Sequence, residues 1–154
     1  ENSDGSGPVL FGHSYGGPVV LRTAVEHPDR VAWVVLVSGA CDPYMNDAQW
    51  FRRCVVFLGR LVPRPWANAN AELLALTDEN RAMEPTLGRV TAPVIVLHGQ
   101  WDAVCPCDGT VAYLRRSLVN ARSLEVRELE RTGHNIHLTN PHMIAQAIAK
   151  LARR

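Results

Sequence analysis

Ser14 is the residue whose surroundings in this chain are most typical of a nucleophile. It lies in the stretch GHSYGG, where an apolar run that begins at Val9 meets a second apolar run. A serine at a tight strand-to-helix turn needs close approach of the surrounding backbone, and glycines permit this because they have no Cβ. We predict that Gly12 and Gly16 leave room around the turn and that Gly17 eases the entry to the helix.

Two residues farther along the chain could activate Ser14. A serine hydroxyl is a weak nucleophile at neutral pH and needs a base, which in turn needs a carboxylate to orient it. Asp102 follows an apolar run in HGQWDAVCP, and His134 follows a later run in TGHNIHLTNP. Active sites of open parallel sheets collect at the carboxyl ends of the strands. The sequence therefore predicts a triad in the chain order Ser14, Asp102, His134.

Strand-like and helix-like runs alternate along the chain and must position these residues. The alternation predicts an α/β domain with a parallel sheet and flanking helices. We expect strands at residues 7–13, 31–38, 93–99 and 123–130, and helices at residues 17–27, 108–119 and after 140. The last strand alternates apolar and charged residues, which favours a place near a sheet edge. Asp108 is the expected N-cap of its helix, and Asn140 with Pro141 begins the final helix.

The pattern changes between residues 40 and 91. This segment is rich in aromatic and aliphatic residues, and LVPRPW reads as a helix breaker within it. We expect two or three short helices here, one of them at residues 71–76, inserted between the second and third strands. The chain is then a single partial domain over residues 1–154, with a core of residues 1–39 and 92–154.

The three motifs GHSYGG, VLHGQWDAVCP and TGHNIHLTNP together resemble the α/β-hydrolase superfamily, specifically its lid-bearing serine esterase-like members. The resemblance covers nearly all of the chain but only the later half of that fold. It implies that Ser14 is the nucleophile, Asp102 the acid and His134 the base. It also implies that the backbone N–H of Tyr15 is an oxyanion donor, and that residues 40–91 form a helical lid over an acyl pocket.

Hydrolysis of a small apolar ester or related acyl substrate through an acyl-enzyme is the expected activity, with no cofactor. A serine in this position argues against the dehalogenases and epoxide hydrolases of the superfamily, which use aspartate there. Two alternatives stay open. One is a ligand-binding or receptor-like homologue with little turnover, and the other is a triad-bearing C–C hydrolase or perhydrolase.

Asp42 and His137 are alternatives for the acid and the base. Asp42 follows the second apolar run in SGACDP, where some superfamily members keep their acid, but the fuller motif favours Asp102. His137 lies three residues after His134, and the Gly-His start of that motif favours His134. For His137 we expect packing against the lid or the pocket rim.

The remaining histidines have simpler explanations. His13 and His98 flank glycines at strand ends, where we expect structural roles. A metal site formed by His134, His137 and His142 is disfavoured, because neither cysteines nor carboxylates join them at ligand spacing.

Composition limits the other function classes. The chain has 154 residues, 47% of them hydrophobic, and a net charge of +1 with scattered basic residues, so no nucleic-acid footprint is visible. It has no run of about 18 apolar residues, which a membrane span would need. The four cysteines fit free thiols in a reducing compartment, and we expect a cytoplasmic protein.

The resemblance also predicts what the chain lacks. Further strands and a second oxyanion donor belong to the earlier half of the fold, so we expect the chain to be one portion of a larger hydrolase. The strand containing VLFGH would then present an unprotected apolar edge. We expect that edge to pair with the missing N-terminal half or with another chain.

Overall fold

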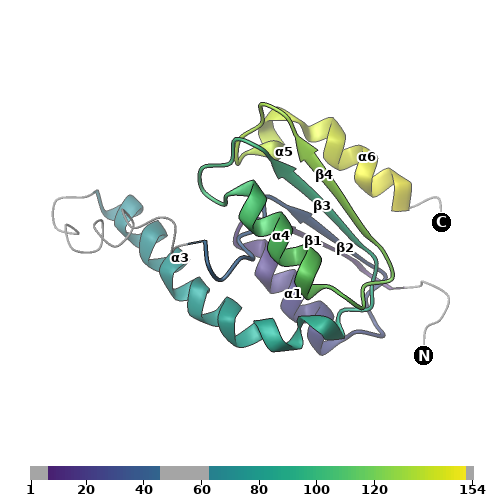
Figure 1. Cartoon of the computed structure of the whole chain (residues 1–154). Coiled ribbons are helices and arrows are strands. Elements are labelled where there is room, and N and C mark those ends of the chain that lie inside the picture. Colours follow the sequence, from purple (N-terminus) through teal and green to yellow (C-terminus); the bar gives the residue numbers. More distant parts are fainter. Residues whose placement is uncertain (1–6, 46–62, 152–154) are drawn as a thin grey trace.

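A computed structural model describes residues 7–45 and 63–151 of the chain. Its centre is a four-stranded sheet in which neighbouring strands run parallel, in the order β1-β2-β3-β4 (Figure 1). The strands are β1 Val9–His13, β2 Trp33–Val37, β3 Val94–Gly99 and β4 Leu124–Leu129. The predicted α/β fold class and the edge position of the last strand in the described sheet are confirmed.

Helices cover both faces of the sheet. Helices α1 (Gly16–Glu26) and α4 (Cys107–Ser117) connect parallel neighbours and lie on one face, whereas α6 (Pro141–Leu151) lies on the other (Figure 1). The rule that such connections are right-handed places α1 and α4 on the same face, since the strand order follows the sequence order. No described helix meets the length and apolarity that a membrane crossing demands.

The central strands supply two separate apolar cores because successive side chains of a strand point to opposite faces. In β2, Val34 and Leu36 pack against α1 and α4, and Val35 and Val37 pack toward α6. Strand β3 repeats the alternation, and every residue of this strand is buried. A strand buried on both faces reads as a continuous apolar run, as β2 and β3 do.

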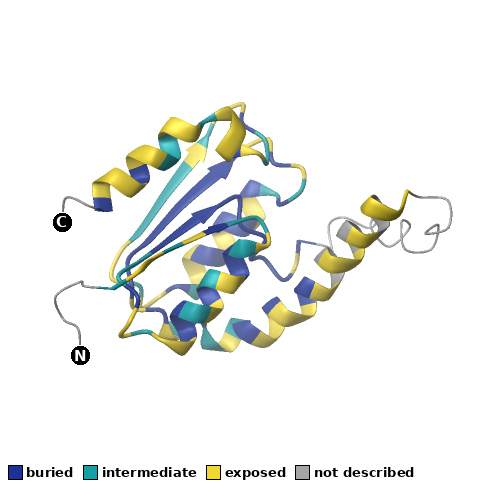
Figure 2. Cartoon of the chain, turned by 180° about the vertical axis from the view of Figure 1, so that it is seen from behind, coloured by how far each residue is buried: buried dark blue, intermediate teal, exposed yellow. Residues whose placement is uncertain are grey.

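The two outer strands differ from the central ones. Strand β4 is half-buried along most of its length. In β1, Val9 and Phe11 lie on the α6 face and remain 43% and 42% exposed, since α6 does not reach across to cover them (Figure 2). The described sheet therefore has an apolar, unpaired edge at β1.

The described part of the insertion is simpler than the sequence indicated. Residues 64–83 form one continuous helix, α3 (Arg64–Met83), followed by the 3-10 segment η1 (Glu84–Arg89). The predicted separate piece at residues 71–76 is therefore wrong, whereas LVPRPW does mark a helix boundary, because α3 begins within it after Pro63. The prolines precede the helix or lie in its first turn, where the missing N–H costs no hydrogen bond. Residues 46–62 lie outside the described part, and the lid remains a prediction.

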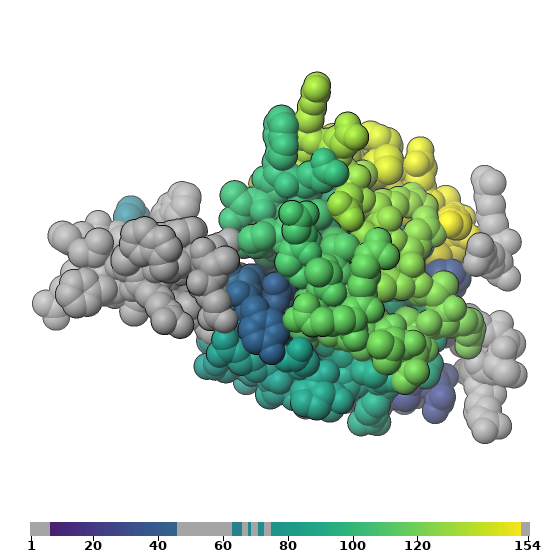
Figure 3. All heavy atoms as spheres, in the orientation of Figure 1, coloured from purple at the N-terminus to yellow at the C-terminus, as the bar shows by residue number. Residues whose placement is uncertain are grey.

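The segment that follows β2 reaches the surface between α3 and α4 (Figure 3). The hydroxyl of Tyr44 donates to Glu84 Oε2 at 2.9 Å, and the guanidinium of Arg116 lies 5.8 Å from the centre of the Tyr44 ring. These contacts fasten the start of the insertion to η1 and α4.

Most of the predicted strand and helix boundaries differ from the observed ones by one or two residues. Helix α4 begins at Cys107, so Asp108 lies in its first turn and is not the N-cap, which is Pro106. A short helix that the sequence analysis missed, α5 (Ile136–Thr139), precedes α6. The final helix begins at Pro141 as predicted.

Candidate active site

Ser14 occupies the sharp turn between β1 and α1. Its φ of 52° lies in the left-handed region, which is unfavourable for a residue with a Cβ. The turn is held by its neighbours: the Ser14 N–H donates to the carbonyl of Val37 at 3.0 Å, and the Ser14 carbonyl accepts from the N–H groups of Gly17 and Ala40 at 3.0 and 2.9 Å. Such strain persists where the surroundings fix the backbone, and it is common at functional sites.

Two glycines make this turn possible. A Cβ at Gly12 would collide with the carbonyl group of Gly16, and a Cβ at Gly17 would lie 2.9 Å from the Cα of Gly39. The prediction for Gly12 is confirmed. The prediction for Gly16 is wrong, because a Cβ there would have no described atom within 4 Å. Gly17 serves the close approach of α1 to the segment after β2.

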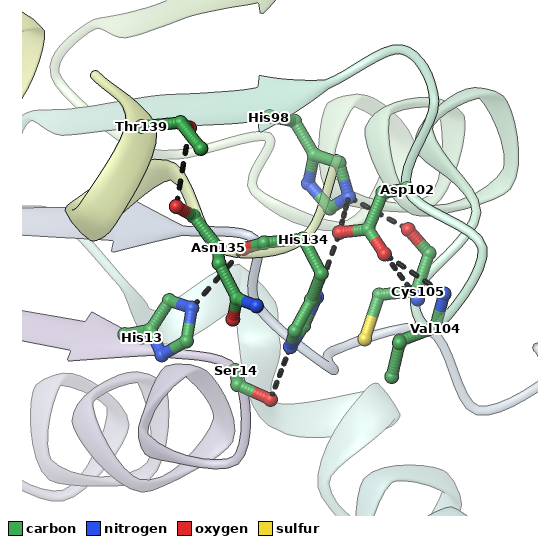
Figure 4. Close-up of polar contacts among 9 residues, drawn as sticks. All are labelled: His13, Ser14, His98, Asp102, Val104, Cys105, His134, Asn135 and Thr139. Carbon is green, nitrogen blue, oxygen red and sulfur yellow. Dashed lines mark hydrogen bonds and ion pairs between the residues drawn. The ribbon is translucent and has the colours of Figure 1, made fainter. Parts of the chain in front are cut away.

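Three of the predicted residues meet in one line of hydrogen bonds (Figure 4). His134 Nε2 lies 2.9 Å from Ser14 Oγ, and His134 Nδ1 lies 2.8 Å from Asp102 Oδ2. A carboxylate can only accept, so Nδ1 donates to it and a neutral ring leaves Nε2 to accept from the serine hydroxyl. His134 is thus in the position of a general base for Ser14.

Asp102 is held from two sides. Its side chain is fully buried, and Oδ1 accepts the backbone N–H groups of Val104 and Cys105 at 2.9 and 2.8 Å. Burial alone would raise the pKa of Asp102. The hydrogen bond from His134, the nearby N–H of His98 and the hydrogen bond from the Cys105 N–H outweigh that effect, so the pKa lies well below its ordinary value and the group is a carboxylate.

The loop that carries His134 crosses the carboxyl end of β3 to reach Ser14. A Cβ at Gly99, the last residue of β3, would collide with the carbonyl oxygens of Thr132 and Gly133. The N–H of Trp101 also donates to the Thr132 carbonyl, at 2.9 Å. Gly99 is not among the residues predicted from the sequence, although a glycine at the end of a buried strand is a signal of such close approach.

His13 supports the same loop. Its Nε2 lies 3.3 Å from the carbonyl oxygen of His134, to which an N–H there donates. Its ring packs edge-on against that of His137, with centroids 4.4 Å apart, whereas the sequence analysis placed His137 against the lid or the pocket rim. Burial lowers the pKa of His13, and the hydrogen bond to His134 opposes this only in part. The neutral ring therefore contacts the loop backbone.

The alternative acid takes up another position. Asp42, just beyond β2, accepts the backbone N–H of Tyr44 through Oδ1 at 2.8 Å. The carboxylate that contacts His134 is that of Asp102. Tyr15, the residue after Ser14, immediately precedes α1 with φ −54° and ψ −32°. Its role as an oxyanion donor stays a prediction.

Potential metal ligands do not gather at the histidines. Within the described residues, His134, His137 and His142 do not come together as a ligand set. One group does have ligand atoms within 4.8 Å of one another, formed by Cys107, Asp108 and Glu128. Two of these three are exposed acids, which often cluster without an ion.

Solved structures share this fold. A monoacylglycerol lipase from Paleococcus ferrophilus matches with a TM-score of 0.67 and 21% identity over 96% of this chain and 68% of its own. An α/β hydrolase from the sediment metagenome of the Mar Chica lagoon, Morocco, matches with a TM-score of 0.65 and 17% identity over 94% of this chain and 60% of its own. The 2-hydroxy-6-oxo-6-phenylhexa-2,4-dienoate hydrolase from Rhodococcus sp. strain RHA1 matches with a TM-score of 0.59 and 20% identity over 96% of this chain and 64% of its own. The chain thus spans about two thirds or less of these proteins.

The parallel sheet, its helical layers and these similarities show that the chain forms part of an α/β-hydrolase fold. A family model described as serine aminopeptidase, S33, matches residues 1–86, more than half of the chain, and the chain belongs to this family. The matched residues include Ser14 but neither Asp102 nor His134.

Proposed function

We propose that this chain carries the nucleophile, base and acid of a serine hydrolase that cleaves carboxylic esters through an acyl-enzyme. The observation that carries the proposal is the continuous hydrogen-bond line from Ser14 Oγ through His134 to Asp102, with Ser14 held at a positive φ. A nucleophile, a base within reach of it and a group that orients the base are the parts that such chemistry needs.

The mechanism follows from the three side chains. Ser14 Oγ attacks the ester carbonyl while His134 Nε2 takes its proton, and Asp102 fixes the ring tautomer and stabilises the imidazolium. The N–H of Tyr15 donates to the oxyanion. His134 then protonates the leaving alcohol, and a water molecule, deprotonated by the same ring, releases the acid product and restores Ser14.

A small apolar acyl ester is the proposed substrate, and residues 40–91 are proposed to cover its acyl group. Met45 and Leu76 of this insertion pack in one buried cluster with Ala40 and Cys105, beside the turn that carries Asp102. A similar fold in a monoacylglycerol lipase is consistent with a lipid-like ester. A second candidate activity is hydrolysis of a dienoate, because the Rhodococcus protein of similar fold is a dienoate hydrolase.

A further segment is proposed to pair with the free edge of β1, either from the same gene product or from another chain. Strand β1 pairs with β2 on one side only in the described sheet, and its apolar Val9 and Phe11 are exposed. The same segment would bring the second oxyanion donor. Loss of one such donor costs about 2.7–4 kcal/mol of transition-state stabilisation, so we expect the isolated chain to react about 100- to 1,000-fold more slowly.

Labelling by a fluorophosphonate probe tests the proposal. We expect covalent labelling of the purified protein and its loss in Ser14→Ala. Ser38→Ala is the matched control, because Ser38 is also buried, also has a positive φ of 45° and lies at the end of the adjacent strand. Labelling that persists in Ser14→Ala, or its absence both in the chain and in any longer product that contains it, contradicts the proposal.

Turnover separates the alternatives. A hydrolase labelled at Ser14 releases p-nitrophenol from short-chain esters repeatedly. A receptor-like homologue is labelled but stops after one equivalent, and a C–C hydrolase turns over a dienoate in preference to the esters.

A further inference from the structure

His98 adjoins the candidate site from inside the sheet. It is the penultimate residue of β3, and its side chain is fully buried. Its Nε2 lies 2.8 Å from the carbonyl oxygen of Cys105 and 3.4 Å from Asp102 Oδ2 (Figure 4). A carbonyl oxygen only accepts, so Nε2 carries a hydrogen, and this N–H is directed at the carbonyl with the carboxylate close beside it.

Cys105 links His98 to the other oxygen of the carboxylate. Its carbonyl accepts from His98, and its own N–H donates to Asp102 Oδ1 at 2.8 Å. His98 therefore fixes the backbone that grips Oδ1 and also approaches Oδ2, which is the oxygen bound to His134. Both oxygens of Asp102 depend on this one imidazole, directly or through one residue.

Packing alone does not explain a histidine here. His98 Nδ1 is buried and has no hydrogen-bond partner among the described residues. An unpaired buried nitrogen is unfavourable, and an aliphatic side chain of similar size would avoid it. Among the described residues, the polar contacts of the ring are made by Nε2, on the side of Asp102.

We propose that His98 is a positioning residue that holds the turn of residues 102–105 against β3 and directs Asp102 Oδ2 at His134. The inference rests on the proposed function, since it assigns His98 a role in the same reaction. Among the described residues, His98 makes no hydrogen bond to Ser14 or His134, so its effect on them would be transmitted by Asp102. Misplacement of a supporting group by about 1 Å can slow a reaction about 100-fold.

Two amide variants of His98 differ only in reach. In His98→Gln the side-chain nitrogen can take the place of Nε2, and in His98→Asn it can reach only the place of Nδ1. We expect His98→Gln to keep fluorophosphonate labelling and kcat within about 5-fold of the unchanged protein, and His98→Asn to lose about 10- to 100-fold in both with KM little changed. His98→Leu keeps the volume without a donor and should be as slow as His98→Asn.

A packing role predicts the opposite order, with His98→Leu faster than His98→Gln, and that result overturns the proposal. Equal rates for His98→Gln and His98→Asn also overturn it. If His98→Leu does not fold, the two amide variants decide the question alone. Val96→Ala, in the core on the same face of β3, is the control for lost stability and should keep the labelling rate of folded protein.

The proposed function is judged separately. If neither the unchanged chain nor a longer product that contains it is labelled at Ser14, the proposed function fails, whatever the His98 variants do. If the unchanged protein is labelled and His98→Asn reacts at the same rate, only the role of His98 fails.

Discussion

His134 Nε2 lies 2.9 Å from Ser14 Oγ although the two residues are 120 positions apart in the chain. Ser14 follows β1 and His134 follows β4, the two outer strands of the described sheet. Their contact depends on the loop after β4, which crosses the end of β3 at Gly99. Asp102 comes from the turn after β3, so it meets His134 at Nδ1, the ring nitrogen that does not face Ser14.

Asp102→Asn should lower kcat of ester hydrolysis by about 10⁴-fold, because an amide can offer its N–H to His134 and favour the wrong tautomer. Asp42→Asn is the matched control, since Asp42 also follows a central strand but binds the Tyr44 N–H. We expect this variant to stay within a few-fold of the unchanged protein. Steady-state kinetics that reverse the two results would assign the acid to Asp42.

The free energy of unfolding should fall in acid, because Asp102 becomes protonated. Its pKa in the folded protein lies below the ordinary 3.8, so the unfolded chain binds the proton more readily. The stabilisation is therefore complete well above pH 3.8 and is lost as the pH falls toward the folded pKa. Urea unfolding from pH 6 to pH 2 should show a smaller loss of stability in Asp102→Asn than in the unchanged protein. Equal losses would refute a depressed pKa.

Alanine at Gly12 and alanine at Gly16, the two glycines nearest Ser14 on either side, should change the free energy of unfolding differently. Gly12→Ala should lower the free energy of unfolding by about 1–3 kcal/mol or more, because its Cβ meets backbone that cannot move freely. Gly16→Ala should be neutral or stabilise by up to about 1 kcal/mol, because Gly16 begins α1 with open space around it. Urea denaturation measures both, and comparable destabilisation would contradict the local geometry.

The exposed edge of β1 should drive association. We expect the isolated chain to self-associate, and Phe11→Lys to reduce that association, because a charge on an edge strand disfavours pairing. Val19→Lys is the control, since Val19 is 54% exposed but lies on α1. Sedimentation velocity compares the three proteins. A monomeric unchanged chain, or equal effects of the two lysines, would argue against an interface at β1.

Much of the site could be predicted because local motifs combine with a rule of topology. Parallel strands bring their carboxyl ends to one edge, so motifs after three strands place Ser14, Asp102 and His134 together. The motif spacing and the strand pattern are both local in the sequence. The line of hydrogen bonds therefore agrees with the expectation without any knowledge of strand register.

Contacts that depend on strand register were harder to predict. A glycine at the end of a buried strand was the one signal for the loop after β4, which passes over Gly99, and no local signal places His98, one residue earlier in β3, beside Asp102. Helix α3 differs from the prediction for another reason. LVPRPW does mark a helix boundary, with Pro63 as the N-cap and Pro65 in the first turn, but the helix then continues through residues 71–76 to Met83.

The central claim is that Ser14 attacks with His134 as its base, and a pre-steady-state burst tests it most directly. Mixing the protein with a p-nitrophenyl ester should release about one equivalent of p-nitrophenol in an initial phase that is faster than the steady state, and mass spectrometry should locate the acyl group on the peptide that contains Ser14. The burst should disappear in His134→Ala and persist in His137→Ala, whose ring packs against His13. An acyl group on another residue, or an unchanged burst in His134→Ala, would contradict the account.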